Sequence, residues 1–391
     1  MSPQGEEKID TPYFEKIVEA LKNEPILPVA LRPLNYGQEK KRFLHHGDNP
    51  NFKYDAIRRE NYYSGIRVLD SLENDLKSEK NGAITKLYLA KIFELRLHLD
   101  LRRAIGNNAK ELFHLSTQLY SKPNSKETKK ALEDFKEELE LKKIGKEERK
   151  KYDAGVIKKA FDRAIKILKI DRWQALVESQ AKTSITINSK HEKGCVVEIP
   201  INRHADIYEI EGLVNHEIAT HLARGKSGEL SKLNLIAFMG ADGYAATEEG
   251  LATYAEQRLA QEREMIPKKA GVKATLSIGA VLEGRNFKET YDFLLSIGFN
   301  HRDAWKYTYR VFRGVADTSR VSGILTFDWR YRLGNQQVWE LVHRNGEKTL
   351  DRLWVGKIGI QHLDLMKRLN ILKPAIARQY VRIEEVLPEL C

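Results

Sequence analysis

The stretch LVNHEIATHLARG, Leu213–Gly225, places the strictest geometric condition on how this chain can fold. Its apolar residues recur at helical spacing around a polar centre, which predicts a partly buried helix. His216 and His221 are five positions apart, and on a regular α-helix such positions point about 140° away from each other. One inserted residue, a π-bulge, would bring them to a common face, and such bulges are frequent at functional sites. We therefore expect either a bulged helix whose histidines share a metal ion, or two unrelated histidines that are buried or cap structure.

A second helical stretch supplies acidic residues that could complete a metal site. AATEEGLATYAEQ, Ala245–Gln257, predicts a helix with Thr247 as N-cap and with Glu248 and Glu249 in its first turn. Catalytic zinc sites use three protein ligands, and two histidines with one glutamate are one such set. Thermolysin-like zinc enzymes place that glutamate on a helix after the histidine helix. Glu217 would then be the base that activates the attacking water and later protonates the leaving amine. Glutamates that only favour the helix dipole remain the plainer alternative.

The composition limits which kinds of protein and which kinds of partner are expected. The chain has 391 residues, is 41% hydrophobic and carries a formal charge of +11, so it can bury a large core and favours acidic partners. Its two cysteines, Cys195 and Cys391, do not form a disulfide framework and indicate a reducing compartment. The polar N-terminus and the absence of a long apolar run predict a cytoplasmic protein without a membrane partner.

The N-terminal part, residues 1–155, is expected to form a helical region. Apolar periodicity predicts helices at Tyr13–Asn23 and Ile84–Ile105. Prolines, glycines and asparagines in residues 26–55 predict an irregular wrapping segment between them. The highly charged residues 121–155 predict a solvated helix or connector, with a polyanion-binding patch as the second interpretation.

The remaining residues, 156–391, are expected to form a zinc metallopeptidase catalytic region. Ser184–Asn188 and Cys195–Ile201 predict a β-hairpin just before the histidine helix. Residues 311–334 predict loop and strand, and residues 356–372 predict helix. The expected fold class is α+β and predominantly helical, with a thermolysin-like zinc peptidase core and a small antiparallel sheet.

The combination of NHEIATHLARG and TEEGLA resembles the microtubule-associated tyrosine carboxypeptidase family, whose metal motif is HExxxH and whose bacterial relatives carry a QEGLA motif. Other stretches, such as RPLNYGQEKKRFL, LFHLSTQLYSKP and LTFDWRYRLG, are also similar to family stretches. The resemblance extends over roughly Pro33–Leu372, which is most of the chain.

The resemblance implies a zinc carboxypeptidase with one Zn²⁺ per chain. His216 and His221 match the two histidine ligands, and Glu217 matches the catalytic glutamate. The acidic residue of the QEGLA motif falls on Glu249, which is therefore the expected third ligand, with Glu248 as the alternative. Animal members remove the C-terminal tyrosine of α-tubulin, and related members trim C-terminal glutamates. The type of activity carries over to this chain better than the substrate does.

A carboxypeptidase must also hold the C-terminal carboxylate of its substrate. Arginine suits this task because it forms bidentate hydrogen bonds with carboxylates. The candidates are Arg224, three positions after His221, and Arg310 and Arg313 in RVFRG, with Lys357 as a further one. For each of them, an ordinary structural or surface charge is the competing interpretation.

Two further roles have candidates in the sequence. Tyr331 in FDWRYRLG is the first candidate to donate a hydrogen bond to the oxyanion that develops at the cleaved carbonyl, and Tyr244 is the second. Asp328 or Asp242 could orient a ligating histidine through its second ring nitrogen.

Three functional hypotheses follow from these residues. The first is a zinc carboxypeptidase acting on C-terminal tails of proteins or peptides, with acidic tails favoured by the charge and with tubulin favoured in an animal. The alternative is a catalytically silent binding protein for acidic filaments or nucleic acid, in which Glu217 would have no evident use; nucleic acid is the less favoured partner. The third is a zinc endopeptidase, which would also cleave peptides with an amidated C-terminus.

Overall fold

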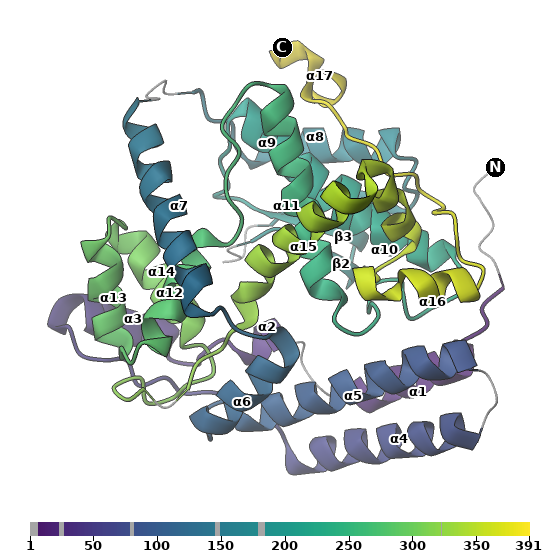
Figure 1. Cartoon of the computed structure of the whole chain (residues 1–391), viewed down its shortest axis with the longest axis horizontal. Coiled ribbons are helices and arrows are strands. Elements are labelled where there is room, and N and C mark those ends of the chain that lie inside the picture. The colour runs from purple at the N-terminus through teal and green to yellow at the C-terminus, as the bar shows by residue number, and fades with distance from the viewer. Residues whose placement is uncertain (1–6, 23–26, 79–81, 145–148, 179–183, 322) are drawn as a thin grey trace. The chain divides into compact units, whose positions relative to one another are not determined.

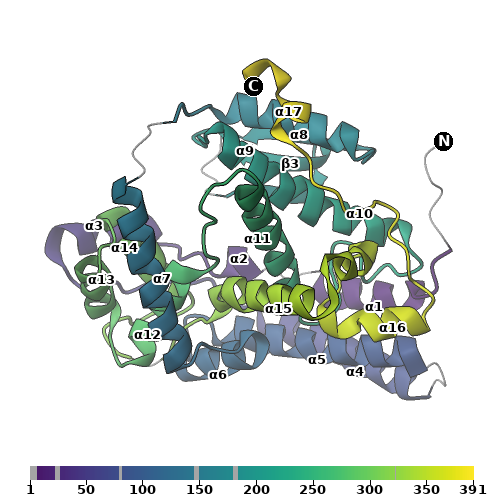
Figure 2. The same ribbon diagram turned by 45° about the horizontal axis from the view of Figure 1, so that its top comes forward.

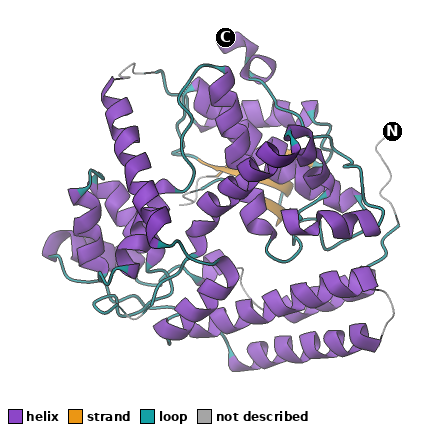
Figure 3. Cartoon of the chain, viewed as in Figure 1, coloured by secondary structure: helices purple, strands orange, loops and turns teal. Residues whose placement is uncertain are grey.

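The chain folds into two compact units, each built from separate stretches of sequence (Figure 1). The structure is a computed structural model that describes residues 7–22, 27–78, 82–144, 149–178, 184–321 and 323–391. Unit 1 comprises Met1–Thr11, Gly145–Lys268 and Gly334–Cys391, and unit 2 comprises Pro12–Ile144 and Lys269–Leu333. Both units are dominated by helices, and a small sheet in unit 1 makes the fold class α+β, as predicted (Figure 3).

The sheet of unit 1 has three strands in the order β1-β3-β2. The predicted hairpin is present, because β2 (Thr186–His191) pairs antiparallel with β3 (Gly194–Pro200). The small sheet, predicted to be antiparallel, is mixed, since β1 (Trp173–Glu178) pairs parallel to β3. The central strand β3 is buried from Val196 to Pro200, so it needs a partner on each edge. The short β1 supplies the second partner.

One helix of unit 1 packs against this sheet, and its neighbours include the segment with the histidine motif. α8 contacts both β1 and the histidine segment, and α11 contacts that segment too. Figure 2, which turns the molecule by 45°, shows α11 lying close to α9 and α15. The helices of this unit are α8 (Ala154–Ile167), α9 (Ile207–Leu213), α10 (Ala223–Leu230), α11 (Tyr244–Glu262), most of α15 (Arg330–Asn345), α16 (Leu363–Arg368) and α17 (Ile383–Val386), with 3-10 turns at Glu347–Val355, Ile360–His362 and Pro388–Leu390.

The named elements in the described residues of unit 2 are all helices, and its aromatic core includes Phe43, Phe135, Phe287 and Trp305. Its helices are α1 (Thr11–Leu21), α2 (Leu27–Ala30), α3 (Tyr36–His46), α4 (Arg59–Ser78), α5 (Gly82–Ala104), α6 (Ala109–Tyr120), α7 (Ser125–Ile144), α12 (Val272–Leu282), α13 (Phe287–Ser296) and α14 (His301–Val311), with a 3-10 turn at Phe327–Trp329.

Several expectations for this part of the chain need correction. Residues 26–55 include α2 and α3, so the predicted irregular segment is partly helical. The charged stretch forms α7, and this helix buries Ala131 and Phe135 against α12 instead of being solvated all round. Residues 145–148 of that stretch lie outside the described residues. Among the described residues of 311–334 there is no strand, because the segment runs through a 3-10 turn into α15.

The two units divide the chain differently from the predicted boundary at residue 155. Residues 269–333, expected in the catalytic region, join the unit formed by the N-terminal helices. The physical reason is a shared core: Leu276 and Phe287 pack with Phe43 and Phe135 in one apolar cluster. Among the described residues, no helix is long and apolar enough to span a membrane.

Candidate metal centre

The histidine motif lies on a π-helix that runs without a break from α9 into α10. The π segment covers Val214–Leu222, and the N–H of Ala223 donates to the carbonyl of Ile218, five positions earlier. This pattern places residues five apart next to each other. The rings of His216 and His221 accordingly lie with centroids 4.7 Å apart and planes at 79°. The expectation of a bulged helix is confirmed, although a whole π segment takes the place of a single inserted residue.

The third member of the cluster comes from α11. Oε2 of Glu249 lies 3.8 Å from Nε2 of His216 and 3.7 Å from Nε2 of His221. One potential ligand atom from each of the three residues lies within 4.8 Å of the others. The structure therefore brings together the three residues that the sequence suggested as metal ligands.

α11 begins earlier than predicted. Its first residue is Tyr244, preceded by Gly243 in the left-handed conformation at φ 60°. Thr247 is therefore not the N-cap, and its buried hydroxyl instead accepts the N–H of Ile360 at 3.1 Å. The earlier start moves Glu248 and Glu249 into the second turn, away from the N-terminal dipole position that the plainer interpretation assumed.

One further carboxylate contacts the Nδ1 side of each imidazole. Nδ1 of His216 lies 2.7 Å from Oε1 of Glu256, and Nδ1 of His221 lies 2.9 Å from Oε1 of Glu248. A carboxylate that accepts the Nδ1 hydrogen fixes the orientation of the ring and leaves the lone pair of Nε2 available to a metal. This is the usual arrangement behind a ligating histidine. Both Nε2 atoms face Glu249.

These contacts revise the predicted supporting residues. Glu248, the alternative third ligand, instead contacts Nδ1 of His221, and Asp242 contacts His362 at 2.9 Å. Glu256 was missed by the sequence reasoning. A usable signal existed, because Glu256 lies seven positions after Glu249 on α11 and therefore on the same helical face.

The surroundings shift the pKa values of the two histidines in opposite directions. Burial alone would lower the pKa of His216, but the carboxylates of Glu256, Glu217 and Glu249 raise it to about 10. Burial and the neighbouring His216 lower the pKa of His221 to about 3. Burial also raises the pKa of the Glu217 carboxyl, against the opposing influence of both histidines. In the metal-free chain the two imidazoles thus carry one positive charge between them, on His216, while His221 is neutral.

Arg224, predicted to bind substrate, is fully buried behind His221. Its guanidinium donates to Glu248, to the carbonyl of Leu353 at 2.9 Å and to the carbonyl of Ile358 at 2.7 Å. Lys357 is buried as well and donates to Glu248 at 2.7 Å. Both cations are therefore used to hold Glu248, and their placement does not favour contact with a substrate carboxylate.

The other predicted substrate residues belong to unit 2. Arg310 forms a bidentate pair with Asp328 at 2.5 and 2.6 Å, and Arg313 lies 3.3 Å from the same carboxylate. Burial would raise the pKa of Asp328, but the two arginines hold it well below its usual range. Asp328 thus has an arginine-pairing role. Tyr331 is half-buried near the start of α15, and its role as an oxyanion donor stays a prediction.

Comparison with known families decides the relationship of the chain. The model of the microtubule-associated tyrosine carboxypeptidase family matches residues 41–383, which is nearly the whole chain. This chain belongs to that family. The resemblance seen in the motifs is confirmed, and the family name indicates a peptidase that removes C-terminal residues. No curated protein matches the chain closely enough to count as a relative.

Proposed function

We propose that the chain is a zinc-dependent carboxypeptidase that removes the C-terminal residue from protein tails. The observation that carries the proposal is the convergence of His216, His221 and Glu249, with Glu217 adjacent to the first histidine. The family name makes tyrosine the first candidate for the released residue and a microtubule-associated tail the first candidate for the substrate.

The donor set fits zinc. In a tetrahedral site with zinc–ligand bonds of about 2.0–2.1 Å, the donor atoms lie roughly 3.4 Å apart. The carboxylate oxygen of Glu249 lies 3.7 and 3.8 Å from the two imidazole nitrogens, which is close to that separation. Two nitrogens and one oxygen also match the ligand types of catalytic zinc, which leaves its fourth position open. Zinc bound there would polarise the scissile carbonyl and lower the pKa of water.

Glu217 is the residue of this chain that would move the proton. Its burial raises the pKa of its carboxyl, which suits a group that must accept a proton and then release it. We assign it to take the proton of the attacking water and to deliver it to the leaving amino group. This role would require the carboxylate form at the start of each cycle.

The roles of individual residues in holding the substrate remain predictions. Binding of the terminal carboxylate by Arg310 and Arg313 stays a prediction from the sequence, since both guanidinium groups pair with Asp328. Tyr331 is proposed as the donor to the developing oxyanion. Tyr244, the first residue of the helix that carries Glu249, is the alternative donor.

Release of tyrosine from defined peptides tests this function. We would incubate zinc-loaded protein with an acidic peptide ending in tyrosine, with the same peptide amidated at its C-terminus, and with chelator-treated protein as control. We expect free tyrosine from the first peptide alone, and none after chelation. Internal cleavage of the amidated peptide would indicate an endopeptidase. Binding of the tail without cleavage by zinc-loaded protein would favour the silent binding protein.

A further inference from the structure

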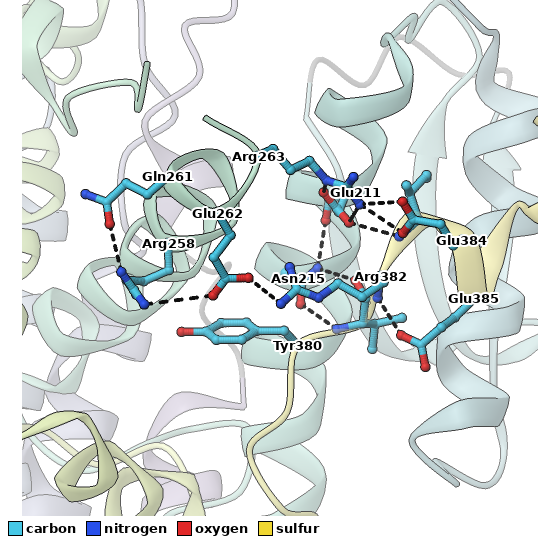
Figure 4. Close-up of polar contacts among 12 residues, drawn as sticks. Glu211, Asn215, Arg258, Gln261, Glu262, Arg263, Tyr380, Arg382, Glu384 and Glu385 are labelled. Atoms are coloured by element: carbon cyan, nitrogen blue, oxygen red, sulfur yellow. Dashed lines mark hydrogen bonds and ion pairs between the residues drawn. The ribbon is translucent and has the colours of Figure 1, made fainter. Parts of the chain in front are cut away.

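The C-terminal segment, residues 376–387, runs along the helix that carries the histidines. Val381, Ile383, Val386 and Leu387 are buried, so the segment is part of the core of unit 1. Figure 4 shows its polar contacts: Asn215 and Glu211 on the helix face the residues around Arg382 and Glu384, while Arg263 at the end of α11 reaches the same place.

Asn215 is fully buried, and both the oxygen and the nitrogen of its amide are hydrogen-bonded within the protein. Its Oδ1 accepts the N–H of Val381 at 2.9 Å, and its Nδ2 donates to the carbonyl of the same residue at 2.8 Å. Nδ2 also donates to the carbonyl of Glu211 at 2.9 Å, one turn earlier in the helix. A buried amide that lost these partners would be left unsatisfied at high cost, so the position of Asn215 is tied to the backbone of Val381.

Glu211 forms the second anchor, one turn before Asn215. Its buried carboxylate accepts the N–H of Ile383 at 2.9 Å and a bidentate pair of bonds from Arg263 at 2.6 Å each. Alternate residues of an extended segment are about 6.6 Å apart, which is close to the 5.4 Å rise of one helical turn. The N–H groups of Val381 and Ile383 therefore match side chains placed four positions apart on the helix.

Asn215 is also linked directly to the spacing of the histidines. It precedes His216, and its carbonyl accepts the hydroxyl of Thr220 at 2.8 Å, the residue that precedes His221. This side-chain bond spans five positions, like the backbone bonds of a π-helix. If the segment relaxed to an α-helix, residues five apart would diverge by about 140°, and the two Nε2 atoms would no longer face one site.

We propose that Asn215 is a positioning residue that holds the π register of the histidine helix against the C-terminal segment, with the backbone of Val381 as its anchor. The inference rests on the proposed function in one respect, because the register serves metal binding. It extends that function by making residues 376–387, which lie at the end of the sequence and far from the motifs, part of what shapes the site.

Four variants test the proposal with zinc affinity and with the visible spectrum of the cobalt-substituted protein. Asn215→Ala removes the amide, and Val381→Pro removes the backbone N–H that donates to it, together with the buried valine side chain. Ser227→Ala is the matched control, because Ser227 is a buried residue that bonds the same segment at Ile376, at 3.1 and 3.4 Å. Gln379→Pro places a proline at an exposed position of the segment.

We expect Asn215→Ala and Val381→Pro to bind zinc about 10–100-fold more weakly and to change the cobalt spectrum. Both controls should match the wild type, although Ser227→Ala should lose stability. Wild-type affinity and spectrum in both test variants would overturn the proposal. Far-UV circular dichroism establishes whether each variant is folded. If one of the two test variants is unfolded, the other still tests the proposal.

A metal-free measurement separates this proposal from the proposed function. Hydrogen exchange of peptide 214–222 in zinc-free protein should be faster in Asn215→Ala and Val381→Pro than in the wild type and Ser227→Ala. If the wild type bound no zinc, the proposed function would fail while the exchange rates would still decide the register. Equal exchange in all four proteins would overturn the positioning role.

Discussion

Glu256 and Glu248 bond the Nδ1 atoms of the two histidines. The proposed proton transfer is therefore assigned to Glu217. We expect Glu217→Gln to lower kcat by about 10²–10⁴-fold, the usual contribution of a general base. The amide keeps the shape of the side chain but cannot accept the proton. Zinc content should be unchanged, and the comparison of kcat with zinc content is the measurement. Full activity in Glu217→Gln would assign the base to another residue.

Glu256 supports His216 from behind, and its removal should act through the metal. We expect Glu256→Gln to weaken zinc binding by about 10–100-fold, as is typical for partners of ligating histidines. Competition with a chromophoric chelator measures the affinity. Glu262→Gln on the same helix is the control, because Glu262 pairs with Arg258 and Arg382 instead of a histidine. Equal zinc affinity in the two variants would contradict the supporting role of Glu256.

At the scale of single residues, the sequence identified the three converging side chains but not their partners. The spacing of His216 and His221 left few geometric solutions, and the family resemblance selected Glu249 over Glu248. The partners at Nδ1 depend on how α11 packs against the π-helix, which no local pattern encodes. Arg224 illustrates the limit: its position near His221 was correct, but only packing reveals that it is buried and holds Glu248.

Among the helices, the close approach of α11 and α15 depends on two glycines. A Cβ at Gly250 would lie 2.3 Å from the carbonyl group of Gly334, and a Cβ at Gly334 would lie 1.7 Å from the carbonyl oxygen of Ala246. Gly250 directly follows Glu249 in the TEEGLA motif. The glycine of the motif therefore has a packing reason, since it lets α11 approach α15 beside the site.

We expect Gly250→Ala to destabilise the protein by about 1–3 kcal/mol, the usual cost of overpacking, and to weaken zinc binding because Glu249 shifts with α11. Urea denaturation and zinc titration measure the two effects. Gly37→Ala is the control, because a Cβ at Gly37 meets nothing within 4 Å. If Gly250→Ala were as stable as Gly37→Ala, α11 could move without cost.

The elements that the sequence predicted share strong local periodicity. The hairpin, α11 and the departure of the histidine helix from α geometry all followed from spacing or alternation. β1 was missed because its six residues gain their strand character from pairing with β3. α7 was expected to be solvated because its charges mask Ala131 and Phe135, whose burial depends on α12.

For the whole molecule, the formal charge of +11 predicts how substrates are attracted. We expect kcat/KM for an acidic peptide ending in tyrosine to fall several-fold as salt rises from about 50 to 300 mM, since screening shortens the reach of the positive field. A neutral peptide with the same terminal residues should change little. Equal salt responses of the two peptides would show that the excess charge does not steer the substrate.

The most direct test of the metal centre is the zinc content of the purified wild-type protein beside that of Glu249→Ala, with Glu217→Gln as the variant that should keep its metal. We expect a single zinc ion per chain in the wild type and in Glu217→Gln, and a large loss in Glu249→Ala, because two imidazoles alone hold zinc weakly. Zinc retained fully in Glu249→Ala, or absent from the wild type, would contradict the His216–His221–Glu249 site.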